Sequence, residues 1–287
     1  MELRLTQRDL DCFKEFLDLG CLTAKQLVNL SLFPNEKKSR DRLRRLNQAR
    51  YVEYCPKPYL GPGRAEYVYY LNDKKISEIL SLLGCVRQDV YFTKPSAHSP
   101  ILLHHLAITD FVICVREACK QSGIYGAEII PEFKQIAGRI SKLKKTIAQR
   151  FITTEIIPDG LICLSRQKED RKSLLFFEIY RGTQTIESGE RSIQHKLEAY
   201  ITYGKRGLYT SLSDLFSYSF KGFRVLLVVY SVSYLEKLKK ICSEIAPLDL
   251  FWLALNEDIT PTTLFKPIWH VPGKEGLKAL VKVGESR

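Results

Sequence analysis

Asp159 and Glu178 are the two residues of this chain whose surroundings most strongly suggest chemistry. They stand in apolar runs, residues 156–164 and 174–180, whose β-branched and aromatic content predicts buried strands. A buried carboxylate is costly unless a cation or hydrogen bonds compensate it, and one shared divalent metal ion would compensate both. The alternative is structural: Asp159 caps a Pro-Asp-Gly turn, and Glu178 pairs with Arg181 or another base.

Two carboxylates on successive strands joined by a short polar hairpin resemble the PD-(D/E)xK nuclease superfamily. That superfamily has a lysine two residues after the glutamate, where this chain has Tyr180. In several branches the lysine lies on the next helix, and residues 186–204 predict such a helix, with Lys196 and Tyr200 four residues apart. The resemblance implies that Lys196 is this lysine. An ordinary solvated helix lysine is the alternative.

These three groups suit phosphodiester cleavage, which requires charge neutralisation at the phosphate and generation of a nucleophile. We expect Asp159 and Glu178 to bind Mg²⁺ or Mn²⁺, hard cations that prefer oxygen ligands. We expect Lys196 to stabilise the pentavalent phosphate or to position water. Tyr200 is a candidate nucleophile, with a packing role as its alternative.

The overall composition favours a polyanionic partner, because the formal net charge is +12 over 287 residues. No uninterrupted apolar stretch is long enough to span a membrane, and the N-terminus carries charges instead of a signal-peptide core, so we expect a cytoplasmic protein without membrane association. The eight cysteines lack Cys-x-x-Cys spacing, which argues against a zinc site.

Residues 1–90 have the pattern of a winged helix-turn-helix domain. A capping-box-like start at Thr6 opens a helix that ends at Gly20, a short second helix follows Leu22, and residues 35–50 predict a third. Two strands around a Pro/Gly turn then predict a β-hairpin. Three helices followed by a hairpin place the third helix as the element that enters a DNA major groove.

The third helix is strongly basic, with seven Lys or Arg against two acidic residues in positions 36–50. We expect Arg42 and Arg45 to read base edges in the groove. The residues expected to contact phosphates are Lys37, Lys38 and, at the tip of the wing, Arg64. A solvated basic helix on a protein-interaction module is the alternative.

Residues 91–100 predict a linker, and residues 101–287 a second domain. Its pattern is a helix at 104–121, three strands, the helix with Lys196, a strand at 223–230, a second helix and a last strand, which is the αβββαβ core of the restriction-endonuclease fold. The whole chain is therefore expected to be α/β (α+β). The adjacent His104 and His105 point to different sides of a helix, which favours packing or capping over catalysis.

A basic segment at residues 134–150 carries six Lys or Arg and no acidic residue. The residues expected to follow a DNA backbone are Lys142, Lys144 and Lys145. The alternative is a mobile basic loop that aids solubility.

The chain resembles the replication-relaxation family of plasmid proteins over roughly residues 5–205. The resemblance rests on these motifs: Leu5-Thr6-x-Arg8-Asp9, Gly20-x-Leu22-Thr23-x-x-Gln26-Leu27, Arg42-Leu43-x-x-Leu46, Gly63-Arg64-x-x-x-Val68-Tyr69-x-Leu71, His105 to Phe111, Pro158-Asp159-Gly160, Phe177-Glu178-x-x-Arg181-Gly182-Thr183 and Lys196-Leu197-x-x-Tyr200. Within that group, the C-class mobilization relaxases combine a winged helix with a nuclease-like domain that has an Asp, Glu, Lys signature.

The resemblance implies a sequence-specific, metal-dependent DNA endonuclease or relaxase that nicks a plasmid or mobile-element transfer origin. Its partner would be double-stranded DNA at a transfer or replication origin, and other transfer or replication proteins are candidate partners. The alternative function is a non-catalytic DNA-binding regulator of plasmid replication or copy number, in which the nuclease fold is a platform.

Overall fold

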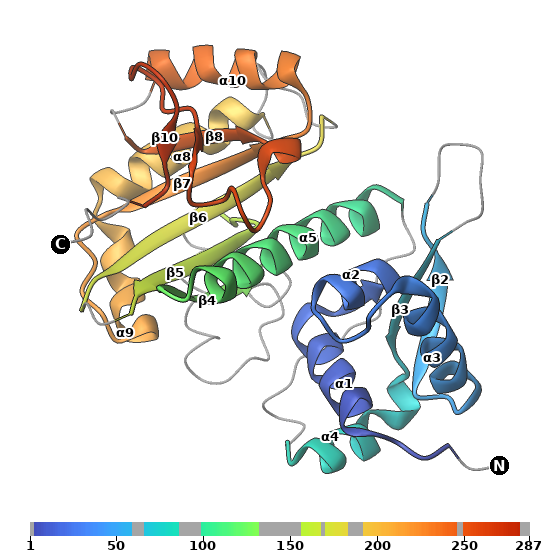
Figure 1. Cartoon of the computed structure of the whole chain (residues 1–287). Helices are drawn as coiled ribbons and strands as arrows, with labels where there is room; N and C mark the ends of the chain where they lie inside the picture. The colour runs from blue at the N-terminus through green and yellow to red at the C-terminus, as the bar shows by residue number, and fades with distance from the viewer. Residues whose placement is uncertain are drawn as a thin grey trace. The chain divides into compact units, whose positions relative to one another are not determined.

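The computed structural model describes residues 3–58, 66–85, 99–131, 156–167, 170–182, 192–245 and 249–281 (Figure 1). They form two compact units, the first extending to Ile113 and the second beginning at Cys114. This division falls inside helix α5 (Ser99–Ser122), whereas the sequence predicted it in a linker at residues 91–100, of which 91–98 lie outside the described residues. Helices combined with a five-stranded mixed sheet confirm the expected α+β class.

The first unit is a small helical domain with a three-stranded antiparallel sheet in the order β1-β3-β2. Its described elements, besides the first half of α5, are α1 (Gln7–Leu19), β1 (Cys21–Thr23), α2 (Ala24–Asn29), α3 (Glu36–Gln48), β2 (Val52–Pro56), β3 (Tyr67–Leu71), η1 (Asp73–Lys75) and α4 (Ile76–Leu83). The three helices and the hairpin occur in the predicted order, and β1 adds a strand that the sequence analysis did not anticipate.

Helix α1 begins and ends where its sequence places the caps. Thr6 and Asp9 form the predicted capping box at the start, which satisfies backbone groups that have no partner inside the helix. Gly20 ends the helix with a φ of 80°, a conformation that a side chain disfavours. A Cβ at Gly20 would also lie 3.2 Å from the ring of His105.

The amino-terminal half of α5 is bound into the first unit. Leu102 and Leu106 pack on Cys21 and Val68 in a small buried cluster. The helix begins earlier than predicted, since Pro100 lies in its first turn, where the missing N–H of proline costs nothing.

Polar contacts also hold α5 to α2 and to the end of α1. The Gln26 side-chain amide donates to the Asp110 carboxylate (2.8 Å) and to the Leu106 carbonyl (3.3 Å). His105 Nε2 donates to the carbonyl oxygen of Leu19 (2.8 Å), and its burial lowers the pKa of the imidazole. His105 therefore has a packing role.

The second unit contains the five-stranded sheet, ordered β4-β5-β6-β7-β8. Besides the second half of α5, its described elements are β4 (Tyr125–Pro131), β5 (Gly160–Arg166), β6 (Lys172–Tyr180), α8 (Ile193–Lys205), η3 (Leu208–Leu212), α9 (Ser213–Phe216), β7 (Phe223–Val229), α10 (Val232–Ile245), β8 (Phe251–Leu255), η4 (Asn256–Asp258), β9 (Pro267–Trp269) and β10 (Lys278–Ala279). Strands β4, β5 and β6 are antiparallel, whereas β6, β7 and β8 are parallel.

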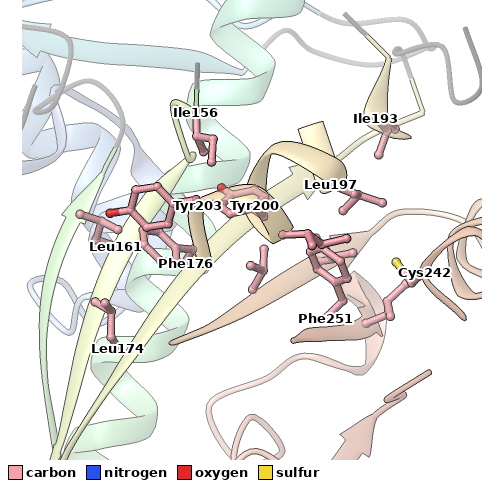
Figure 2. Close-up of a cluster of buried hydrophobic side chains, with 14 of the residues drawn as sticks. Ile156, Leu161, Leu174, Phe176, Ile193, Leu197, Tyr200, Tyr203, Cys242 and Phe251 are labelled. Atoms are coloured by element: carbon pink, nitrogen blue, oxygen red, sulfur yellow. The ribbon is translucent and has the colours of Figure 1, made fainter. Parts of the chain in front are cut away.

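Helices α8 and α10 supply the crossovers between the parallel strands, as parallel pairing requires. Both helices cover the same face of the sheet, because their apolar side chains share one buried cluster with β6 and β7. Figure 2 shows Tyr200 and Tyr203 of α8 beside Phe176 of β6, with ring centroids 5.7 and 5.8 Å from that of Phe176. This packing fixes α8 against the strand that carries Glu178.

Strand β5 begins at Gly160, four residues later than its apolar run predicted. Pro158 has no N–H to donate to a ladder, which accounts for the later start. Asp159 therefore lies at the entrance to the strand. Among the helices that the structure describes, none has the length and apolarity needed to cross a membrane.

Candidate functional site

The strand register brings Asp159 and Glu178 together. Gly160 pairs with Phe177 in the antiparallel β5–β6 ladder, so Asp159, one residue earlier, lies opposite Glu178. Residues directly opposite one another in antiparallel strands project to the same face with their Cβ atoms close together. The two carboxylates, which the sequence predicted on separate strands, thus lie next to each other at the end of the β5–β6 ladder.

Asp159 is held by the backbone of the neighbouring strand. Its Oδ2 accepts a hydrogen bond of 2.6 Å from the backbone N–H of Ile179, and its side chain is buried. Gly160 makes this close approach feasible, because a Cβ there would lie only 2.3 Å from the ring of Phe177. Gly160 is therefore required for close packing of β5 on β6.

Glu178 is bound by two residues of α8. Lys196 Nζ donates to Oε2 and the Tyr200 hydroxyl donates to Oε1, each at 2.5 Å. Lys196 and Tyr200 are four residues apart, so they lie one turn apart on the same helix face. The predicted approach of Lys196 to the carboxylate site is present, and the Lys196 side chain, 28% exposed, connects buried Glu178 with solvent.

Burial dominates the electrostatics of Glu178. It raises the pKa of the carboxyl from its ordinary 4.5 to about 8, with a further increase from the Asp159 charge, against the lowering effect of Lys196 and of the hydrogen bonds from Lys196 and Tyr200. The lowering effect of Lys196 on the pKa of Glu178 is therefore smaller than the raising effect of burial. Additional positive charge at this place would favour ionised Glu178.

Tyr200 is a core residue in the structure. Its side chain is fully buried within the cluster drawn in Figure 2. The pKa of its hydroxyl is raised well above the ordinary value. Burial is the main cause, and the nearby Glu178 carboxylate is the second. Because a tyrosine nucleophile needs access to substrate and loss of its proton, these contacts match the packing alternative, and we withdraw Tyr200 as a nucleophile.

Tyr180 lies on the same face of β6 as Glu178, two residues further along. Its ring is buried 6.5 Å from that of Tyr234 on α10, measured between centroids. Within the described part of the chain its hydroxyl has no hydrogen-bond partner. The position that carries lysine in the nuclease superfamily is thus a buried, uncharged side chain, and the only described lysine on Glu178 comes from α8.

The donor set at this place fits a hard divalent cation. Mg²⁺ is bound in proteins through one or two carboxylates, with waters and substrate phosphates completing the shell, and Asp159 and Glu178 supply two such groups. The incomplete compensation of Glu178 also favours a cation. The described residues contain no cluster of three or more His, Cys, Asp or Glu side chains that could hold a metal ion.

We expect Glu178→Gln to stabilise the metal-free protein, increasingly so from pH 4.5 to 8. In this range unfolded Glu178 ionises while the folded carboxyl keeps its proton, so the wild type loses stability as the pH rises. Glutamine does not titrate, and the rotatable Tyr200 hydroxyl can accept from its amide. The gain should reach on the order of 3 kcal/mol at pH 8.

Urea unfolding in EDTA at pH 5 and at pH 8 measures this gain. The matched control is Glu198→Gln, an exposed glutamate two residues after Lys196 on α8, which should show no comparable pH-dependent gain. An equal stability difference at both pH values would contradict the assignment of a raised pKa to Glu178.

On α3, the structure gives Arg42 a role in the fold. Its Nε donates to Asp9 Oδ1 (2.7 Å), and one terminal nitrogen donates to Asp9 Oδ2 and to the Arg4 carbonyl (3.1 Å). Asp9 is fully buried, and although burial favours a raised pKa, the hydrogen bonds from Arg42 and Thr6 lower it overall. Arg42 therefore joins α3 to α1, and we remove it from the residues expected to read bases.

The other predicted contacts on α3 remain available to a ligand. Lys37, Lys38 and Arg45 are exposed, and the structure gives them no ion pair within its described residues. Arg64 and the segment with Lys142, Lys144 and Lys145 lie outside the described residues. Their predicted phosphate contacts remain predictions.

A groove of about 780 Å³ between α3 and the hairpin was not anticipated from the sequence. Arg40 and Arg44, one helical turn apart, line its helical side, and Tyr54 and Tyr67, with ring centroids 4.8 Å apart, line the strands. The two arginines make only exposed ion pairs with Glu36 and Asp41, which are weak in water. Periodicity shows which residues share a face, but not which faces meet across a groove.

The fold and site define an α+β protein with a carboxylate pair held between neighbouring strands of one unit and a basic helix in the other. The replication-relaxation family model matches residues 15–216, more than half of the chain and including Asp159, Glu178 and Lys196. The chain therefore belongs to the replication-relaxation family, as its motifs predicted, and this membership connects it with plasmid replication and relaxation. The comparisons with curated proteins and with solved structures found no match.

Proposed function

We propose that this protein is a metal-dependent DNA nickase that acts at a plasmid or integrative-element transfer origin. The observation that carries the proposal is the convergence of Asp159 and Glu178 across the β5–β6 ladder, with Lys196 from α8 donating to Glu178. Membership of a family connected with plasmid relaxation supports DNA as the substrate. The β4-β5-β6-α8-β7 order, preceded by α5, supports a restriction-endonuclease-like fold.

Each residue of the site has a defined part in this proposal. Asp159 is kept in place by the Ile179 N–H, so its carboxylate is preorganised for a cation or water. Lys196 places a positive charge between buried Glu178 and solvent, where it can meet a phosphate oxygen. A bound Mg²⁺ or Mn²⁺ would neutralise phosphate charge and promote ionisation of a water molecule. Tyr200 orients the Glu178 carboxylate through its hydrogen bond.

We assign DNA binding to the first unit, as a winged helix-turn-helix. Helix α3 presents Lys37, Lys38 and Arg45 to solvent, and the groove beside it is lined by arginine, tyrosine and acidic side chains. Arginine and tyrosine can donate hydrogen bonds to phosphate oxygens, and arginine can also bind guanine edges. Arg40 and Arg44 accordingly replace Arg42 in the proposed DNA-contacting set.

The experiment that tests the proposal is nicking of supercoiled plasmid that carries the transfer origin of the protein's own element. With Mg²⁺ or Mn²⁺, the protein should convert supercoiled DNA to relaxed circles, because a single-strand cut releases superhelical strain without linearising the molecule. The nicks should carry no attached protein, and Tyr200→Phe should still nick. Absence of nicking with either metal, despite tight binding to the origin, would overturn the proposal.

That last outcome would support the second candidate function, a non-catalytic DNA-binding regulator of plasmid replication or copy number. The observation that favours it is the state of Glu178, whose two oxygens accept hydrogen bonds from Lys196 and Tyr200 and whose pKa of about 8 leaves it largely protonated at neutral pH. Buried Tyr180, at the position of the superfamily lysine, adds to this argument. A regulator would use the carboxylate cluster as structural support.

DNA affinity should separate two sets of α3 residues. Lys37→Ala/Lys38→Ala should weaken binding to every sequence and reduce the salt slope by about one per lost phosphate contact. Arg45→Ala should cost about 1–3 kcal/mol on the specific site and much less on unrelated DNA. Fluorescence anisotropy over a salt series measures both effects.

The control for charge is Lys237→Ala/Lys240→Ala on α10, which removes two exposed lysines of the other unit. It should leave specific affinity within about twofold. Equal losses on all sequences from Lys37→Ala/Lys38→Ala and from Arg45→Ala would contradict base reading by Arg45.

A further inference from the structure

A cavity of about 450 Å³ lies between the first turn of α1 and one side of α3. We call it the α1–α3 pocket. Phe33 and Pro34, which precede α3, form part of its lining. The two helices contribute mostly charged side chains to the rest: Thr6, Arg8 and Asp9 from the start of α1, and Lys38, Asp41, Arg42 and Arg45 from α3. The DNA contacts proposed above come from α3, and Arg8 is not among them.

Both acidic residues of the α1–α3 pocket already have a basic partner. Asp9 is fully buried and accepts hydrogen bonds from Arg42 inside the pocket lining. Asp41 pairs with Arg44 at 3.4 Å, a contact between exposed side chains that is weak in water. The basic residues of the lining outnumber the acidic ones by four to two, so the pocket has an excess of positive charge.

The guanidinium of Arg8 faces the pocket. It lies 5.5 Å from the centroid of the Phe33 ring, and Phe33 is a buried residue of the same lining. A ring face orients a guanidinium without using its N–H donors, which leaves them for a ligand. Arg8 is exposed, as are Lys38 and Arg45, and the structure gives none of the three an ion pair within its described residues.

Basic side chains flank α3 on two sides. Lys38 and Arg45 line the α1–α3 pocket, whereas Arg40 and Arg44 line the groove beside the hairpin. Arg40 is two residues after Lys38, which turns it by about 200° round the helix. A helix with its side chains is about 10–12 Å in diameter and the DNA major groove is about 12 Å wide, so the two backbones that border the groove come close to the two sides of an inserted helix.

We propose that the α1–α3 pocket binds a phosphate of the DNA backbone that borders the groove occupied by α3, and that Arg8 contacts this phosphate from α1. The inference rests on the proposed DNA binding by the first unit and adds a second helix to it. Phosphate suits the pocket because arginine and lysine donate charge-assisted hydrogen bonds to its oxygens. A contact of this kind carries no sequence information, but it fixes the register of α3 on the duplex.

Arg8→Ala should weaken binding to an origin duplex and to an unrelated duplex alike, by about three- to tenfold, and should make the salt slope shallower by about one, because one phosphate contact is lost. Arg8→Lys keeps the charge and should keep the slope. Fluorescence anisotropy of the full-length protein over a salt series in EDTA measures both quantities. A loss confined to the origin duplex would overturn the phosphate contact, since it would assign Arg8 to base reading.

The matched control is Lys14→Ala, which removes one exposed cation of the same helix outside the pocket lining. It should change DNA affinity less than about twofold. Equal losses from Arg8→Ala and Lys14→Ala would overturn the pocket, because general attraction between the protein and DNA would then account for both. Both side chains are exposed, so neither substitution should change thermal unfolding appreciably.

Uncharged phosphate analogues locate the contact on the DNA. In a set of origin duplexes, each with one backbone phosphate replaced by methylphosphonate, one or two neighbouring positions should weaken binding of the wild type without weakening that of Arg8→Ala further. At those positions the substitution in the protein has already removed the same contact, so the two effects do not add. Additive effects at every position would overturn a direct contact by Arg8.

The outcomes separate this inference from the function on which it rests. Unchanged binding by Arg8→Ala, together with weaker binding by Lys37→Ala/Lys38→Ala, would overturn the inference alone. Unchanged binding by both variants would overturn DNA binding by the first unit as well. Because EDTA prevents metal-dependent cleavage, failure of plasmid nicking would leave the result for Arg8 intact.

Discussion

Asp159→Asn and Glu178→Gln, each introduced alone, should reduce the rate of plasmid nicking roughly 100- to 1,000-fold. Each substitution removes a negative oxygen ligand and so weakens the cation that stabilises charge at the scissile phosphate. DNA affinity should change little, because neither carboxylate is among the residues proposed to contact DNA. The measurement is single-turnover conversion of supercoiled to relaxed plasmid at saturating protein, with affinity determined separately.

The control for this prediction is Glu198→Gln, which removes an exposed carboxylate from α8 close in sequence to Lys196. It should nick at the wild-type rate. Glu178→Gln has the further property that it is expected to be more stable than the wild type at pH 8, so its loss of nicking could not result from unfolding. Nicking at the wild-type rate by either carboxylate variant would rule out the assigned site.

The second large effect concerns stability. Arg42→Ala should lower the free energy of unfolding by about 3–5 kcal/mol at pH 7, because it leaves the fully buried Asp9 carboxylate without its cation. Arg45→Ala, three residues further along the same helix, should change stability by less than about 0.5 kcal/mol, because its side chain is exposed. Urea unfolding followed by circular dichroism distinguishes the two variants.

The pH dependence adds an independent check on Arg42. The pKa of Asp9 is lowered below its ordinary 3.8 in the folded protein, so the ion pair contributes stability above that value and loses it as the pH falls through the folded pKa. The difference between wild type and Arg42→Ala should therefore be largest near neutral pH and should shrink below pH 3.8. A small effect of Arg42→Ala at pH 7, together with loss of specific DNA binding, would return Arg42 to the base-reading set.

Local sequence patterns predicted most of the elements. The apolar, aromatic-rich run within residues 172–180 predicted the strand that the structure has as β6, and the caps at Thr6 and Gly20 predicted both ends of α1. These features depend on neighbours within a few residues, because capping and periodicity act over one helical turn or one strand. For the same reason Pro100 was misjudged: proline stops a helix from inside but is tolerated in its first turn.

Site residues were harder to assign where a role depends on a distant partner. Arg42 and Arg45 have the same side chain on the same basic helix, yet only Arg42 meets a buried aspartate, 33 residues earlier in the chain. From the sequence, Tyr200 could be either a nucleophile or a packing residue. The packing of α8 on β6 places its ring in the core. A basic or hydroxyl side chain carries no local signal that tells which partner it will face.

By itself, the sequence determined that two carboxylates stand on apolar segments, that Lys196 and Tyr200 share a helix face, and that the third helix is basic, because residue type and spacing are local properties. The tertiary structure alone decided that Asp159 lies opposite Glu178, since the pairing depends on the β5–β6 register, in which Gly160 meets Phe177. It also decided that Lys196 and Tyr200 reach the two oxygens of Glu178, because the shared core holds α8 against β6. Register and helix docking arise from contacts between distant residues, and these contacts form only when the chain folds.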